Sequence, residues 1–103
     1  MVVRCYSALP NSTVAQVLGR QLLKSGTSVG AHYREANRAK SVADFVSKIE
    51  GALQELDETS YWLDLLSESG VAPNETLAPI SNETEQLISI FVAVAKSAKL
   101  KRK

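Results

Sequence analysis

Basic side chains between residues 20 and 40 are the residues best suited to bind a ligand. Arg20, Lys24, Arg34 and Arg38 are separated by 4, 10 and 4 residues, which places them on one stripe of a helix. Such a stripe can neutralise phosphates of a nucleic acid backbone without reading its bases. Together with Lys40 it forms the candidate nucleic-acid-binding set. The alternative is a solvated face or a face that pairs with another subunit.

Residues suited to covalent or metal chemistry are too few to form a site. The chain has one histidine and one cysteine, so a metal ion would lack further ligands of these kinds. Asp57 and Glu58 are adjacent and point to different sides of a helix, which makes them a poor acid–base pair. We predict no catalytic residue, no metal site, no cofactor and no enzymatic activity. His32 is predicted to be a hydrogen-bonded structural residue, and Cys5 a small buried one.

Three blocks of charge lie behind the net charge of +1. Residues 1–40 carry six basic residues against one acid, residues 41–90 carry ten acids against one base, and residues 91–103 add five bases. Such blocks place opposite potentials on different surfaces of a small protein. They can pair within or between subunits, or the basic surface can meet nucleic acid. Only Tyr33 could stack on bases beside the stripe, so recognition of single-stranded bases is not supported.

Length and composition fit a single domain over residues 1–103. Hydrophobic residues make up 45% and charged residues 22%, as in an ordinary globular protein, and the lone cysteine fits a reducing compartment. The longest apolar run, residues 87–95, is far shorter than the roughly 20 residues of a membrane helix. The first ten residues lack the pattern of a signal peptide. We therefore expect a cytoplasmic protein with no membrane partner.

Apolar residues recur at alternating steps of three and four, the period of helices packed along a seam. Short connections between long helices favour antiparallel neighbours, and a much shorter helix at residues 2–9 leaves part of a groove open. No run of alternating polarity predicts a strand. The predicted fold class is all-α, an up-and-down antiparallel four-helix bundle with a short first helix. The seams are Leu18, Leu22, Ser25, Val29, His32 and Ala36; Val42, Phe45, Ile49, Ala52, Leu56, Thr59, Leu63 and Leu66; and Leu77, Ile80, Thr84, Leu87, Phe91, Val94 and Ala98.

Capping and turn residues predict where these helices begin and end. A serine or asparagine before an apolar period starts a helix by accepting a backbone N–H, and a glycine or proline after it ends the helix. Two starts are open for the last helix, because Pro79 removes a backbone bond and can kink it. The predicted bounds are Pro10 for the end of the first helix, Ser12–Lys40 for the second, Ser41 with Asp44 to Gly70 for the third, and Asn74 or Asn82 for the start of the fourth.

Two glycines interrupt the second helix within the stretch "SGTSVG" at residues 25–30. A phosphate-binding loop would need a preceding strand and a lysine after the second glycine, and the sequence offers neither. Each glycine costs a helix about 1 kcal/mol relative to alanine, so close contact with another helix is the expected compensation. Ser25, Gly26 and Gly30 are the predicted helix-packing notch.

The third and fourth helices carry more apolar side chains than one seam can bury. A helix that is apolar all round is buried all round, and one small bundle cannot cover both sides. Leaving Trp62 in water would forgo a few kcal/mol, at about 25 cal/mol per Å². We therefore predict a homo-oligomer, whose candidate interface residues are Tyr61, Trp62, Leu65, Ile88, Ile90 and Val92.

Two stretches, "SGTSVGAHYREANRAKSVADFVSKI" and "ELDETSYWLDLL", resemble a family of bacterial four-helix bundle proteins. The family includes proteins encoded by intervening sequences in large-subunit ribosomal RNA genes and accessory proteins of diversity-generating retroelements. The resemblance runs from about Leu9 to Lys99 and implies an antiparallel four-helix bundle that assembles into a ring of five. For the retroelement branch it also implies RNA or DNA and a reverse transcriptase as partners. His32 departs from the asparagine usual in relatives, and the first helix looks short.

Two functions remain open from the sequence. The first is a non-enzymatic, oligomeric adaptor that binds the backbone of RNA or DNA through its basic faces. The alternative is a structural or protein-interaction module that binds no nucleic acid and uses its basic blocks for its own assembly. The resemblance favours the adaptor, whereas the small net charge of +1 favours the module.

Overall fold

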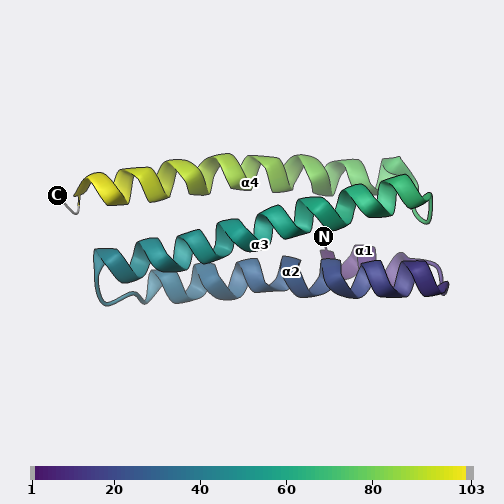
Figure 1. The fold of residues 1–103 in the computed structure, drawn as a ribbon, viewed down its shortest axis with the longest axis horizontal. Helices are drawn as coiled ribbons and strands as arrows, with labels where there is room; N and C mark the ends of the chain where they lie inside the picture. The colour runs from purple at the N-terminus through teal and green to yellow at the C-terminus, as the bar shows by residue number, and fades with distance from the viewer. Residues whose placement is uncertain (1, 102–103) are drawn as a thin grey trace.

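The computed structural model describes residues 2–101, and this part of the chain forms four helices and no strand. As predicted, the fold is all-α, and the helices run up and down as an antiparallel four-helix bundle with a short first helix (Figure 1). None of the described helices combines the length and apolarity that a membrane crossing requires. The helices are α1 (Val2–Ala8), α2 (Thr13–Asn37), α3 (Val42–Ser69) and α4 (Asn74–Lys101).

Serine hydroxyls start α2 and α3 where the sequence predicted. The Ser12 Oγ accepts a hydrogen bond from the N–H of Ala15 at 3.2 Å, and the Ser41 Oγ accepts one from the N–H of Asp44 at 3.0 Å. The Asp44 carboxylate accepts a further bond from the N–H of Lys40 at 3.4 Å. These caps supply partners for backbone N–H groups that the helices themselves leave unbonded.

Two predicted bounds need correction. The second helix ends at Asn37 and not at Lys40, because the N–H groups of Arg38 and Ala39 bond to carbonyls three residues back and tighten the last turn. The fourth helix begins at Asn74, so the alternative start at residue 82 is wrong and Pro79 lies inside α4. So near the start of a helix, proline removes one backbone bond without ending it.

The central helix of the bundle is α3, which packs against α2 along one side and α4 along the other. No Cα atom of α2 comes within 8 Å of one in α4 among the described residues. The short helix α1 contacts both α2 and α4, and Figure 1 shows its N-terminus near the middle of the long axis. Because the bundle is 50 Å long, α1 reaches along only about half of it.

Buried apolar residues form two clusters, separated by a layer of the buried hydroxyls Ser25, Thr59 and Thr84. The Thr59 Oγ1 lies 3.0 Å from the Ser25 Oγ. We call the end with α1 the closed half and the other end the open half. The closed half is built on Cys5, Leu22, Leu63, Leu66, Ala72, Leu77 and Ile80, and the open half on Ala36, Ile49, Ala52, Leu56, Phe91 and Ala95.

The predicted seams hold in the middle of the helices and drift at the ends of α3 and α4 in the open half. Val46 is buried where Phe45 was expected, and Val42 is exposed. In α4, Ala95 is buried whereas Val94 is only half-buried. A straight helix turns by about 20° per heptad away from a strict seven-residue repeat, which accounts for the drift.

Candidate functional site

The five predicted nucleic-acid-binding residues are all exposed. Arg20, Lys24, Arg34 and Arg38 lie on the side of α2 that faces away from its buried residues, and none of them forms an ion pair within residues 2–101. We call these four residues the basic stripe. Lys40 lies beyond the end of α2, so it flanks the stripe and does not continue its helical spacing.

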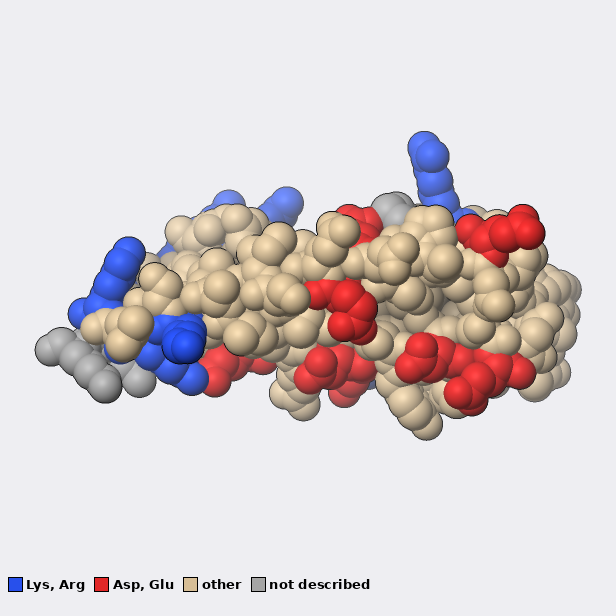
Figure 2. Space-filling model, turned by 90° about the horizontal axis from the view of Figure 1, so that it is seen from above, with Lys and Arg blue, Asp and Glu red and all other residues tan. Residues whose placement is uncertain are grey.

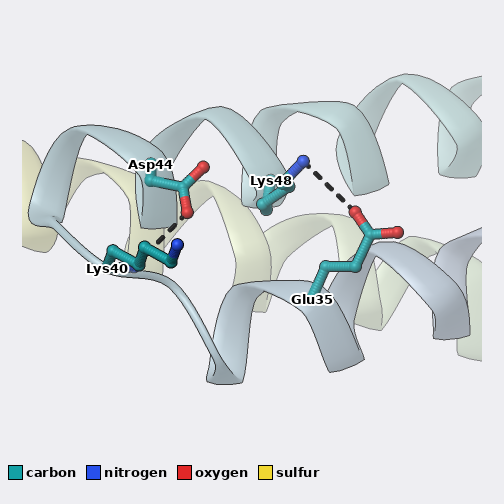
Figure 3. A network of polar contacts seen from close by, with 4 residues as sticks. All are labelled: Glu35, Lys40, Asp44 and Lys48. Carbon is teal, nitrogen blue, oxygen red and sulfur yellow. Dashed lines mark hydrogen bonds and ion pairs between the residues drawn. The ribbon is translucent and has the colours of Figure 1, made fainter.

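Polar contacts at the turn between α2 and α3 involve other charges (Figure 3). Glu35 pairs with Lys48 of α3 at 3.3 Å, and the Asp44 carboxylate accepts from the Lys40 N–H. Both members of the ion pair are largely exposed, so the pair contributes little stability. It does direct the Glu35 carboxylate toward α3, which leaves the stripe without an acidic neighbour of its own.

A second group of bases lies at the far end of the open half. Figure 2 shows the face of α4, where Lys and Arg gather mostly at the end of that helix, while Asp and Glu spread over the rest. Lys99 and Lys101 belong to the last turn of α4, and Lys99 pairs with Glu50 of α3 at 3.2 Å. The basic stripe of α2 and the lysines of α4 thus meet at one end of the molecule.

The one aromatic residue expected beside the stripe points elsewhere. The Tyr33 ring stacks on Phe91 of α4, with ring centroids 5.7 Å apart and the planes 10° from parallel. It therefore lies over the open half of the core and away from the basic side chains. The stripe offers charge without a stacking platform, as in contacts to the phosphate backbone.

The predicted helix-packing notch is filled at one end and empty at the other. Ser25 is buried, and its Oγ donates to the carbonyl of Leu22 at 3.3 Å. A Cβ built on Gly26 would lie 2.8 Å from both methyl groups of Val2, so this glycine makes room for α1. Gly30 differs from the expectation, since a Cβ there would meet nothing within 4 Å. The reason is that α1 begins at Val2 and does not extend over Gly30.

The six candidate interface residues do not lie on one face of the protomer. Tyr61, Ile90 and Val92 are 56%, 54% and 50% exposed, whereas the other three are half-buried. Ile90 lines a depression between α2 and α4, but Val92 lines one beside α3 on another side of α4. Residues two positions apart on a helix point in different directions, so the sequence alone does not make them neighbours.

An apolar groove between α2 and α4 was missed as a site by the sequence analysis. It consists of three depressions of about 290, 420 and 710 Å³, joined in order because the first two share Val29 and Leu87 and the last two share Val94. The sequence signal was the short first helix, which predicted an open groove without its lining. We call this surface the α2–α4 groove. Its middle section is lined by Val29, Gly30, Tyr33, Ile49, Leu87, Ile90, Phe91 and Val94.

His32 lies between α2 and α3 and differs from its prediction. Its Nδ1 is buried and has no hydrogen-bond partner in the described structure. A Cβ on Gly51 would lie 3.0 Å from the Cε1 of this ring, so Gly51 leaves room for it. The pKa of the nearby Glu55 carboxyl is raised, first by burial and then by Glu58. We find no group of three His, Cys, Asp or Glu residues that could hold a metal ion within residues 2–101.

Comparison with known proteins places this geometry in context. A family model described as 23S rRNA-intervening sequence protein matches residues 1–93. Among solved structures, the chain is similar to a protein of unknown function from the S23 ribosomal protein family of Bacteroides thetaiotaomicron VPI-5482. The two share 38% identity with a TM-score of 0.86, covering 92% of this chain and 88% of the other. No curated protein matches the chain.

Proposed function

Because the chain belongs to the family of 23S rRNA-intervening sequence proteins, as its sequence indicated, we propose that it is a non-enzymatic adaptor that binds the backbone of RNA or DNA. In this proposal the basic stripe makes the contacts, and Lys40 extends them at the end of α2. Copies of the chain assemble into a ring, which repeats the stripe around its circumference. A reverse transcriptase is the protein partner that the retroelement branch of the resemblance suggests.

The observation that supports this proposal is the arrangement of the basic stripe. From Arg20 to Arg38 it extends about 27 Å along α2, at 1.5 Å per residue. Its middle positions are Thr27 and Ala31, which are small enough to let a nucleic acid lie close to the helix. Four exposed guanidinium and ammonium groups in a row release counterions from phosphates, the main source of affinity in sequence-independent binding.

Salt-dependent binding of a labelled RNA and a labelled DNA tests the proposal. Reversing charge with Arg34→Glu and Arg38→Glu is expected to weaken binding at least tenfold at low salt, and to lower the slope of affinity against salt by about 1 per phosphate contact. Arg4→Glu with Lys96→Glu makes the same change in charge on α1 and α4 and is expected to have a smaller effect. Affinity no better than millimolar at low salt, or an affinity that the Arg34 and Arg38 reversals leave unchanged, would refute the proposal.

A second candidate function is a structural or protein-interaction module that binds no nucleic acid. The half-exposed side chains of Tyr61, Ile90 and Val92 favour it, because another protein surface would remove them from water. Analytical ultracentrifugation tests the assembly that both candidates share. We expect a mass of five copies, reduced by Tyr61→Glu or Val92→Glu and unchanged by Glu75→Gln at an exposed position near the start of α4. A stable monomer at micromolar concentration would contradict the predicted homo-oligomer.

A further inference from the structure

The α2–α4 groove has the width and length of one helix. In the closed half the same position between α2 and α4 is occupied by α1, whose first residue Val2 lies against Gly26. From Gly26 to Asn37, α2 continues for about 17 Å, at 1.5 Å per residue. A helix of about 11 residues, placed in line with α1, would therefore cover the groove.

The lining of the groove suits the apolar face of such a helix. Val29 and Tyr33 form the α2 wall, Leu87 and Ile90 form the α4 wall, and α3 lies beneath them. Ile90 is 54% exposed although it sits at the edge of a core cluster. Gly30 presents bare backbone to the groove, so a docked helix can approach α2 closely, as α1 does at Gly26.

Charge at the far end of the groove sets a direction for the docked helix. Lys40 and Lys101 both line the last depression, where α2 and α4 come to their C-terminal ends. The C-terminus of a helix carries partial negative charge, so the positive N-terminus of a third helix is favoured between two such ends. Acidic side chains in its first turn would then meet the two lysines and also stabilise its own dipole.

We propose that the α2–α4 groove binds one amphipathic helix of another protein, which lies in line with α1 and carries acidic side chains in its first turn. A second copy of this chain offers outer surfaces of helices that are already packed against their neighbours. A separate helical segment fits the groove's single-helix width and its charge. This site does not use the basic stripe, so the proposal stands independently of nucleic-acid binding.

Two peptides of identical composition test the proposal. The first, acetyl-SDEALKALVQALKA-amide, has its acids in the first turn, and the second, acetyl-SKAALKALVQALDE-amide, has them in the last. We expect the first peptide to bind the protein at least tenfold more tightly by fluorescence anisotropy. Lys40→Glu with Lys101→Glu is expected to abolish this preference, whereas Arg34→Glu with Arg38→Glu changes it by less than about threefold.

A variant that blocks the groove without damaging the fold completes the test. Gly30→Leu fills empty space and raises helix propensity, so it is expected to keep or raise the melting temperature while weakening the first peptide at least tenfold. Ala31→Leu adds a leucine one residue further along, on the solvent side of α2, and is expected to bind normally. Absence of binding at millimolar peptide, equal affinity for both peptides, or normal binding by Gly30→Leu would overturn the proposal. A change in the sedimenting mass of Gly30→Leu would also overturn it, because a second copy would then be the occupant.

Discussion

The closed and open halves of the bundle are built from the same three long helices and differ in whether α1 covers them. In the closed half, α1 places Cys5 and Val2 over the core, and Leu22 is fully buried. In the open half, Leu87 and Val94 remain half-exposed along the α2–α4 groove. A helix of seven residues thus decides which apolar residues are removed from water.

The two glycines of α2 show the same difference at a single position. Gly26 and Gly30 are four residues apart on one helix, yet only Gly26 has a neighbour against it. At Gly26 the missing side chain allows contact with α1. At Gly30 it leaves a gap in the protomer, and the cost of glycine in a helix is not offset by any contact within residues 2–101.

Truncating a leucine in each half should give the largest contrast. Leu22→Ala removes a side chain with no exposed area and is expected to lower the free energy of unfolding by about 2–5 kcal/mol. Leu87→Ala, at the edge of the groove, is expected to cost about 1 kcal/mol, because much of its surface is already in water. Urea unfolding of both variants measures the difference. Equal costs would show that something covers the groove in solution.

Alanine at the two glycines should change stability in opposite directions. Gly30→Ala is expected to raise the free energy of unfolding by about 1 kcal/mol, since the added methyl group meets nothing. Gly26→Ala is expected to lower it by about 1–2 kcal/mol, because the methyl group would clash with the stiff, branched side chain of Val2 and displace α1. Thermal unfolding followed by circular dichroism checks both signs. Stabilisation by both substitutions would mean that α1 does not pack against Gly26.

The hydroxyl layer between the halves should contribute a smaller amount. Thr59→Val keeps the shape of the side chain but removes its hydrogen bonds to Ser25 and to the Glu55 carbonyl, and it is expected to cost about 1 kcal/mol. Thr27→Val is the control, because Thr27 is exposed and bonds only to carbonyls of its own helix. Its expected effect is within about 0.5 kcal/mol. Chemical denaturation distinguishes the two, and equal effects would argue against a buried hydroxyl layer.

The smallest expected effect is the pH dependence of the closed half. Burial raises the pKa of the Cys5 thiol, and the positive N-terminal charge offsets part of this rise. As pH rises, the unfolded chain loses the thiol proton before the folded chain does, so stability falls through this alkaline range. Cys5→Ala should remove that part of the slope in denaturation curves measured across it. In the native protein, iodoacetamide should alkylate Cys5 at least tenfold more slowly than in urea, and equal rates would place Cys5 in solvent.

Local signals in the sequence predicted most of the helices. Ser12 and Ser41 cap their helices because a hydroxyl bonds to a nearby backbone N–H, and Gly70 ends α3 because its φ of 72° suits glycine. The exposure of the basic stripe also followed from spacing alone. The end of α2 was misplaced by three residues, since no nearby residue in the sequence marks Asn37 as the last one.

Side-chain neighbours in different helices were predicted less well. Tyr33 was expected near the bases and instead stacks on Phe91, which is 58 positions further along the chain. The candidate interface residues Ile90 and Val92 were grouped by their apolar character, but they line different depressions. Which sides of two helices meet depends on how the helices are rotated and shifted against each other, and this packing is not written in the spacing of either one.

By itself, the sequence determined the class of the fold, the start of each long helix and the exposure of the basic stripe, because caps and the period of three and four act within single helices. Only the tertiary structure decided that Gly26 is covered and Gly30 is bare, and that Val29, Leu87 and Val94 line one groove. These facts depend on the point along α2 at which α1 begins to cover it. That point is set by packing between helices, through contacts that no single segment of the chain contains.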